Sequence, residues 1–206
     1  MILQDRDYLI LNEVYRWRIC LGRHIKDLCN FEGVRATDRR LSKLLEAGYL
    51  ERKKILYGIP GIYTLSYKGR ILINVNKNKE NIRVEQVVHD ITVLDVACKL
   101  IKSSVMKREN IITDKQLHSL DGFAVRKHRP DFVINNKTRK MAVEIELSLK
   151  SKERLEQNVK DNYMNYENQF WFVPQNQNKI KKYLEEFKTS YSAIEIFVIE
   201  DVLKNG

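Results

Sequence analysis

The segment from Arg35 to Arg70 constrains the fold of this chain more than any other stretch of the sequence. Its first part carries leucines at the i, i+3, i+4 spacing that is typical of one buried helix face. Gly48 follows, and because glycine readily adopts the left-handed backbone conformation, it predicts the end of that helix. A strand is predicted from Tyr49, then a turn at 58–61, which contains two glycines and a proline, and a second strand at 62–65. The sequence therefore predicts a helix followed directly by a β-hairpin.

The other face of this helix is cationic, and the first strand of the hairpin is basic. With helices predicted before it at 5–19 and 23–29, this order is the outline of a winged helix-turn-helix, whose recognition helix can enter the DNA major groove. The candidate DNA-binding residues are Arg35, Thr37, Arg39, Arg40 and Lys43 on the helix and Arg52, Lys53 and Lys54 on the strand. Helix residues could pair with base edges, whereas strand residues would contact phosphate or the minor groove. A charged helix face is also the usual appearance of a solvated surface, so this pattern leaves both interpretations open.

The distribution of charge favours the DNA-binding interpretation. The formal net charge is +10, and residues 1–78 contain 15 Lys and Arg against 8 Asp and Glu. Residues 79–206 contain 22 against 19, so the excess lies with the proposed helix and hairpin, where phosphate contacts would be made. An anionic membrane would also attract a basic chain. We expect no membrane partner, because no basic amphipathic helix has a Trp or Phe face.

The cysteines and the first residues predict a cytoplasmic protein. Cys20, Cys29 and Cys98 are odd in number and form no CxxC pair, so neither a zinc ribbon nor a disulfide framework is indicated. Free thiols in a reducing compartment account for them. The N-terminal residues have acids where a signal peptide needs a basic and then an apolar run, and no segment is apolar for long enough to span a membrane.

The chain divides by composition into two predicted domains. Residues 1–75 form the winged helix-turn-helix, the polar Asn- and Lys-rich segment 76–83 is a linker, and residues 84–206 form an α/β domain. The second domain is expected to contain helices at 84–104, 151–166 and 179–187 and strands at 111–117, 129–134, 141–147, 170–173 and 193–199. The expected fold class is mixed α+β, with helices packed on a sheet.

Three acidic residues of the second domain are candidates for chemistry. Alternation along a strand places Glu144 and Glu146 on one face, and Asp131 lies on the neighbouring strand. Three converging carboxylates repel one another unless a cation joins them, and Mg²⁺ prefers such oxygen ligands. We therefore predict a possible Mg²⁺ site that could activate water against a phosphate ester. The alternative is that these residues lie on a solvated sheet face or pair with Arg129 and Lys140.

This arrangement resembles the PD-(D/E)xK nuclease core, which consists of a helix, three strands, a helix and a strand. Pro130-Asp131 matches the first element of that motif and Glu144 matches its second acid. The lysine of the motif is replaced by Glu146, and Lys150 is a candidate substitute from the following segment. The resemblance implies a metal-dependent DNA endonuclease with Asp131, Glu144, Glu146 and Lys150 as catalytic residues. The missing lysine leaves open a related domain without catalysis.

A second resemblance covers nearly the whole chain. It depends on the predicted winged helix, Val87–Val96 (VVHDITVLDV), His128–Asp131 (HRPD), Glu144–Leu155 (EIELSLKSKERL) and a tyrosine further on. These features are similar to the replication-relaxation family, which is related to mobilisation protein C of plasmids and integrative elements. The resemblance implies DNA binding at an origin of transfer or replication and assistance to a relaxase or a replication initiator.

Three functions therefore remain open at the level of sequence. The first is a sequence-specific double-stranded DNA-binding accessory protein without catalysis, which could act as a homodimer on repeated sites. The second is the Mg²⁺-dependent endonuclease, and the third is a transcription regulator whose second domain senses a ligand. The third is the weakest, because the chain has no Gly-rich phosphate loop.

Overall fold

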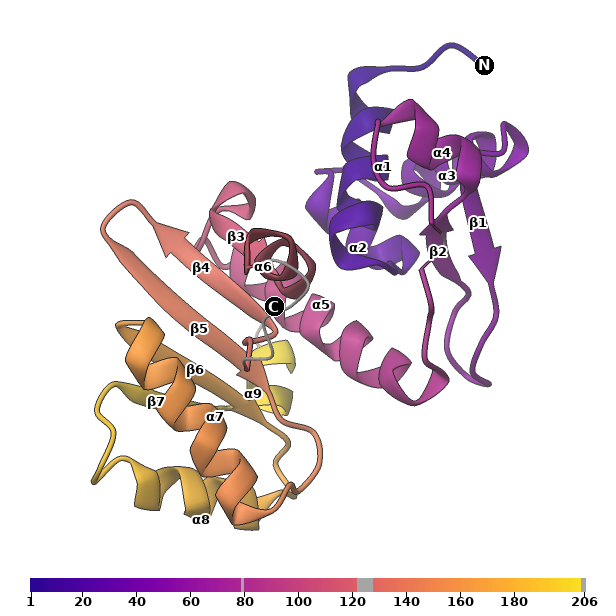
Figure 1. Cartoon of the computed structure of the whole chain (residues 1–206). Helices are drawn as coiled ribbons and strands as arrows, with labels where there is room; N and C mark the ends of the chain where they lie inside the picture. Colours follow the sequence, from indigo (N-terminus) through magenta and orange to yellow (C-terminus); the bar gives the residue numbers. More distant parts are fainter. Residues whose placement is uncertain (79, 122–127, 205–206) are drawn as a thin grey trace. The chain divides into compact units, whose positions relative to one another are not determined.

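The computed structural model describes residues 1–78, 80–121 and 128–204, and it confirms the mixed α+β class. The chain forms two compact units, Met1–Cys98 and Lys99–Gly206 (Figure 1). The first unit contains α1 (Asp5–Trp17), α2 (Gly22–Leu28), α3 (Val34–Glu46), β1 (Leu50–Lys53), β2 (Ile62–Leu65), α4 (Tyr67–Leu72) and the 3₁₀ turn η1 (Val84–Gln86). The division between the units falls within the following helix, α5 (Val87–Lys102).

The core of the first unit follows from the helical spacing of its apolar residues. Ile10, Val14 and Trp17 are buried along one face of α1, and Leu41 and Leu44 are buried along one face of α3. Because residues three and four positions apart share a helix face, each helix presents a continuous apolar stripe to the others. Arg35, Arg39 and Lys43 of α3 are thereby left on the outside, whereas Thr37 is buried with the leucines.

The hairpin pairs with a third short segment, at Cys20, that the sequence did not predict. Strands β1 and β2 pair antiparallel, with Leu50 opposite Leu65. Cys20, which lies between α1 and α2, exchanges two backbone hydrogen bonds with Tyr63 of β2, at 3.0 and 2.7 Å. Gly48 adopts a φ of +75° after α3, so the helix ends where glycine predicted it.

The predicted linker is attached to the first unit. Arg70 of α4 is buried, and its guanidinium lies 3.5 Å from the Glu80 carboxylate and 3.3 Å from the carbonyl oxygen of Asn76. Ile82 packs against an apolar cluster that joins α5 to the hairpin; its buried members are Ile19, Leu21, Ile62, Val87 and Ile91. The first compact unit therefore extends beyond the predicted 1–75 and includes most of α5.

The second unit is built on a five-stranded mixed sheet with the order β3-β4-β5-β6-β7. Its elements are η2 (Arg108–Asn110), β3 (Ile111–Thr113), α6 (Asp114–Asp121), β4 (Phe132–Asn136), β5 (Arg139–Ile145), α7 (Lys152–Asn165), β6 (Asn168–Val173), α8 (Asn178–Phe187), β7 (Ile194–Val198) and α9 (Ile199–Lys204). Strands β3, β4 and β5 pair antiparallel, whereas β5, β6 and β7 pair parallel. The parallel pairs need crossover connections, and α7 and α8 supply them.

One face of this sheet is covered by α7 and α8 (Figure 1). Trp171 and Val173 of β6 and Ile194 of β7 are buried there. The helices contribute Leu155, Val159, Ile180, Leu184 and Phe187 to the same cluster. Alternation along β6 places Trp171 and Val173 on one side, so a single strand supplies two large residues to this core.

The predicted strand at 111–117 was wrong in its second half. Only Ile111–Thr113 is a strand, and α6 begins at Asp114. The side chain of Gln116 accepts a hydrogen bond from the backbone N–H of Thr113 at 3.0 Å, and the Thr113 hydroxyl accepts one from Gln116 at 3.4 Å. This Thr-x-x-Gln pattern is a capping box, which starts a helix and which the strand interpretation overlooked.

Candidate nucleic-acid interface

Three of the predicted DNA-binding residues form one exposed line along α3. Arg35, Arg39 and Lys43 are spaced four residues apart and are all exposed, on the side of the helix away from Leu41 and Leu44. None of the three forms an ion pair with a residue that the structure describes. This exposed line therefore offers three cationic groups that are available to an anionic partner.

Two of the predicted DNA-binding residues have structural roles instead. Arg40 forms an ion pair with the fully buried carboxylate of Asp7 on α1, and its side chain is only 14% exposed. Thr37 is 1% exposed, and its hydroxyl donates a hydrogen bond to the carbonyl oxygen of Gly33 at 3.0 Å. The prediction that Arg40 and Thr37 read bases is corrected, because neither side chain can leave its partner without breaking a buried contact.

The hairpin keeps its predicted cations at the surface. Arg52, Lys53 and Lys54 are all exposed. The Arg52 guanidinium lies 5.5 Å from the centre of the Tyr63 ring, and Lys53 lies 3.3 Å from the Glu51 carboxylate. A cation above an aromatic ring is held in place by the ring's electrostatic field. The hairpin therefore presents a basic edge in which Arg52 is oriented by its neighbour.

Sequence reasoning missed a polar cluster that fixes α2 to α5. Arg23 donates two hydrogen bonds to Asp95, both at 2.8 Å, and His24 Nε2 lies 2.9 Å from the same carboxylate. His24 Nδ1 accepts from the backbone N–H of Leu21, so Nε2 carries the proton that faces Asp95. Burial alone would raise the pKa of Asp95, but the hydrogen bonds from His24 and Arg23 lower it to about 2. This ion pair holds α2, the helix that precedes α3, in a fixed position.

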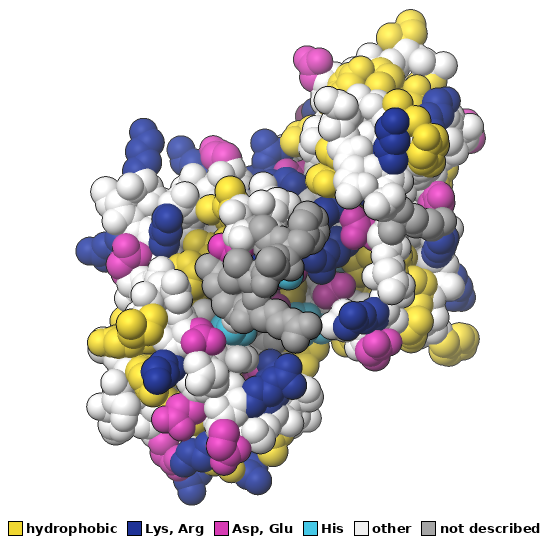
Figure 2. Space-filling model, viewed as in Figure 1, with side chains coloured by type: hydrophobic (Ala, Val, Ile, Leu, Met, Phe, Trp, Pro, Cys, Tyr) yellow, Lys and Arg dark blue, Asp and Glu magenta, His cyan; other side chains and the backbone are white. Residues whose placement is uncertain are grey.

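The charged side chains are mixed over the face that Figure 2 shows. Lys and Arg side chains are interspersed there with Asp and Glu, so the net positive charge does not gather into one continuous patch on that face. A DNA contact is therefore better attributed to particular residues of α3 and the hairpin than to the overall charge of the protein.

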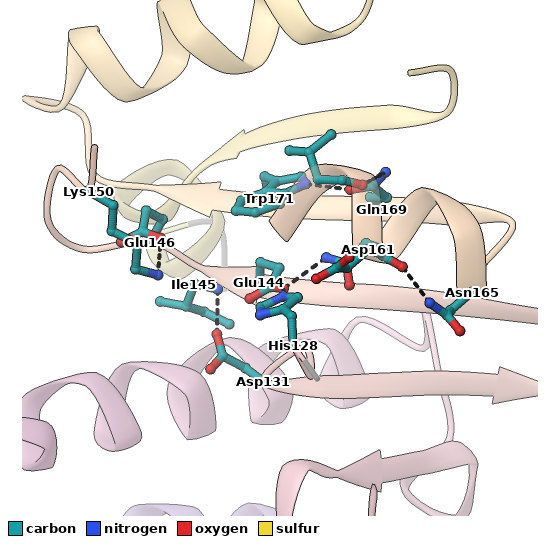
Figure 3. A network of polar contacts seen from close by, with 12 residues as sticks. His128, Asp131, Glu144, Ile145, Glu146, Lys150, Asp161, Asn165, Gln169 and Trp171 are labelled. Carbon is teal, nitrogen blue, oxygen red and sulfur yellow. Dashed lines mark hydrogen bonds and ion pairs between the residues drawn. The ribbon is translucent and has the colours of Figure 1, made fainter. Parts of the chain in front are cut away.

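The three predicted catalytic and metal-binding carboxylates are each engaged by the protein (Figure 3). Asp131 accepts a hydrogen bond from the backbone N–H of Ile145 at 2.7 Å. Glu144, which is buried, lies 2.5 Å from His128 Nε2 and accepts from the Asn162 amide at 2.8 Å. Glu146, also buried, pairs at 2.5 Å with the ammonium of Lys150.

These contacts do not fit the predicted Mg²⁺ site. A Mg²⁺ ion needs carboxylate oxygens that converge on one point, but here Glu144 is directed at His128 and Glu146 at Lys150. Over residues 1–78, 80–121 and 128–204 no three His, Cys, Asp or Glu side chains are grouped so that they could hold a metal. Lys150, which was predicted to replace the missing lysine of the motif, serves as the counter-ion of Glu146.

The His128–Glu144 pair predicts a pH-dependent stability of the second unit. Burial raises the pKa of Glu144 above its usual 4.5, against the effect of His128. Burial would lower the pKa of His128, but the Glu144 hydrogen bond and charge raise it above its usual 6.5. For both residues the folded state binds protons more tightly than the unfolded state. The free energy of unfolding of the second unit is therefore expected to fall as pH rises from 4.5 through the raised pKa of His128.

This prediction is tested by urea unfolding at a series of pH values, followed by the fluorescence of Trp171 in a Trp17→Phe background. The double variant His128→Gln with Glu144→Gln is expected to flatten this decline, since neither glutamine titrates. His118→Gln, which replaces an exposed histidine of α6, is the control and is expected to leave the decline in place. An unchanged pH profile in the double variant would contradict the assignment.

No protein-family model, curated protein or solved structure that was compared matches this chain. None of the helices that the structure describes is long and apolar enough to cross a bilayer. Function is therefore inferred from the geometry of the residues.

Proposed function

We propose that this chain is a sequence-specific double-stranded DNA-binding accessory protein of a plasmid or integrative element. It acts at an origin of transfer or replication, where it assists a relaxase or an initiator, as members of the replication-relaxation family are expected to do. The observation that carries the proposal is the exposed line of Arg35, Arg39 and Lys43 along α3, beside the basic hairpin. An α-helix with such a face fits the major groove, and cations on a flanking hairpin fit the phosphates.

The order of elements in the first unit supports this proposal. Helix α1, the bridging residue Cys20, α2, α3 and then the β1–β2 hairpin follow one another as in a winged helix-turn-helix. The buried leucines of α3 face the core, so the helix is held as a rigid body with its cationic side outward. A preorganised reading helix loses little conformational entropy when it binds.

The second unit is proposed to be a PD-(D/E)xK-like domain that does not cleave DNA. Along the chain, α5, which spans the division between the units, is followed by strands β3 to β5, helix α7 and strand β6 in the order of that core, with α6 inserted. Its carboxylates are engaged by His128, Asn162, Lys150 and the backbone of Ile145. We infer that they stabilise the domain, which then serves in contacts with a protein partner or a second copy.

The Mg²⁺-dependent endonuclease remains as the second candidate, because Asp131 lies directly before β4 and Glu144 lies on the adjacent strand β5. Incubation of supercoiled DNA with the protein and Mg²⁺ distinguishes the two candidates. We expect no nicking that depends on Asp131. Nicking by the wild type that Asp131→Ala abolishes would establish the endonuclease and overturn the non-catalytic assignment.

DNA binding itself is tested by fluorescence anisotropy with duplex fragments that tile the origin of the parent element. We expect one fragment to bind more tightly than the others and all of them to bind more weakly as salt rises. Each phosphate contact contributes a slope of about −0.9 to the dependence of log K on log salt, so several contacts give a steep line. An absence of salt-sensitive affinity for every duplex would refute the proposal.

A further inference from the structure

A pocket of about 300 Å³ lies between α2, α3 and the hairpin in the first unit. Leu21, Val34 and Pro60 contribute apolar surface. The charged groups come from Arg23, Lys26, Asp38 and Arg52. Small-molecule sites in proteins begin at about this volume and combine apolar walls with a few polar groups. This α2–α3–hairpin pocket therefore has the size and the mixed lining of a small-molecule site.

One wall of the pocket is formed by Arg52 and Tyr63. The Arg52 guanidinium lies 5.5 Å from the centre of the Tyr63 ring, and Tyr63 is buried while Arg52 is exposed. A side-chain carbon at Gly61 would come within 2.9 Å of Arg52 Nε, so the glycine lets the Arg52 side chain pass close to the backbone there. Planar groups stack readily on a guanidinium plane.

The opposite wall carries a hydrogen-bond acceptor. Asp38 is exposed on the flank of α3, and a side-chain carbon at Gly22 would lie 4.0 Å from its Oδ1 and 3.9 Å from the Tyr63 ring. Gly22 therefore keeps open the space between Tyr63 and Asp38. An ionised Asp38 accepts hydrogen bonds but donates none, so it selects a ligand edge that donates.

The pocket adjoins the residues that are proposed to contact DNA. Val34, Thr37 and Asp38 of α3 line it, and Arg35 and Arg39 on the same turns belong to the exposed line proposed to contact DNA. Arg52 of the proposed phosphate-contacting edge forms its other side. A DNA strand that passes between α3 and the hairpin would cross the mouth of this pocket.

We propose that the α2–α3–hairpin pocket accepts one unpaired nucleobase of the bound DNA, stacked on Arg52 and hydrogen-bonded through its exocyclic amine to Asp38. The proposal rests on the proposed DNA binding and extends it to a distorted or partly unpaired duplex. Bases are commonly bound by stacking on Arg planes, and a carboxylate accepts from the N4 amine of cytosine. A base that is already unpaired enters at the lowest cost, because no base pair must be broken.

The test compares three short duplexes of one arbitrary sequence: fully paired, with one bulged cytosine, and with one bulged thymine. We expect the wild type to bind the cytosine bulge about tenfold more tightly than the paired duplex, as the stacking of one base provides. The thymine bulge also leaves one pyrimidine unpaired, but thymine has no exocyclic amine. We therefore expect the wild type to bind it less tightly than the cytosine bulge.

Two variants assign the effect to the pocket. Asp38→Asn, which replaces an exposed residue, is expected to abolish the preference for cytosine over thymine, since an amide also donates. Arg52→Lys keeps the charge but loses the plane, so the ratio of bulged to paired affinity is expected to fall.

Three results would overturn the inference: equal affinity of the wild type for the paired and the cytosine-bulged duplex, equal affinity for the two bulges, or a preference that both variants retain. Each of these leaves the proposed function intact as long as the paired duplex binds. Failure to bind any of the three duplexes, together with an absence of salt-sensitive affinity for every origin fragment, would overturn the proposed function as well, so the two failures are distinguishable.

Discussion

Arg40→Ala is expected to lower the free energy of unfolding of the first unit by about 3 kcal/mol, the low end of the cost of breaking a buried ion pair from one side. Asp7 is fully buried, and among the described residues its carboxylate keeps the backbone N–H of Gln4 as its one further hydrogen-bond donor when the guanidinium is removed. The cost therefore comes mainly from an uncompensated buried charge. Urea unfolding followed by circular dichroism and Trp fluorescence measures it.

The neighbouring residue provides the control. Arg39→Ala removes the same side chain one position earlier, where it is exposed, and is expected to change stability by less than about 0.5 kcal/mol. A double variant, Asp7→Asn with Arg40→Met, leaves no buried charge and is expected to recover much of the loss. If Arg40→Ala and Arg39→Ala unfold at the same urea concentration, the ion pair has no structural role.

Arg39→Ala combined with Lys43→Ala is expected to weaken specific DNA binding by about 100-fold, since two base contacts contribute about 1–3 kcal/mol each. Both side chains are exposed and belong to the line along α3, so the fold is expected to remain intact. If one of the two residues contacts a phosphate instead, the salt slope falls by about one unit. Anisotropy titrations at several salt concentrations separate these outcomes.

The matched control for this double variant is Lys179→Ala with Lys182→Ala on α8. It removes the same number of charges from exposed positions of the second unit. Because surface charge acts on DNA mainly through short screened distances, we expect at most a small loss of affinity. An equal loss in both double variants would mean that the affinity reflects overall charge, and the reading role of α3 would be withdrawn.

Much of the local structure could be predicted from the sequence, because apolar spacing and glycine positions are local signals. The strand at 62–65 and the end of α3 before Gly48 were predicted correctly. The start of α6 was missed because the Thr113 and Gln116 capping box resembles a strand in composition. The strand-like role of Cys20 could not be predicted, since it depends on one long-range backbone pairing with Tyr63.

The candidate site was predicted less well than the fold, because charge alone does not reveal burial. Arg39 and Arg40 are adjacent in sequence, yet one is exposed and the other is paired with Asp7. A helical turn of 100° per residue separates them, and the buried acid on α1 is visible only once the helices are packed. Likewise, alternation gave no indication that Glu144 and Glu146 would find separate partners in His128 and Lys150.

The packing of α5 onto the hairpin determines where the chain can be truncated without unfolding the first unit. A fragment that stops at residue 83 would strip the covering from Ile19, Leu21 and Ile62 and would remove Asp95 from Arg23 and His24. Such a truncation exposes apolar surface and removes the carboxylate that pairs with Arg23. The fragment is therefore expected to be poorly soluble. An isolated fragment of the first unit should therefore retain the whole of α5, through Lys102, although the polar segment 76–83 upstream has the composition of a linker.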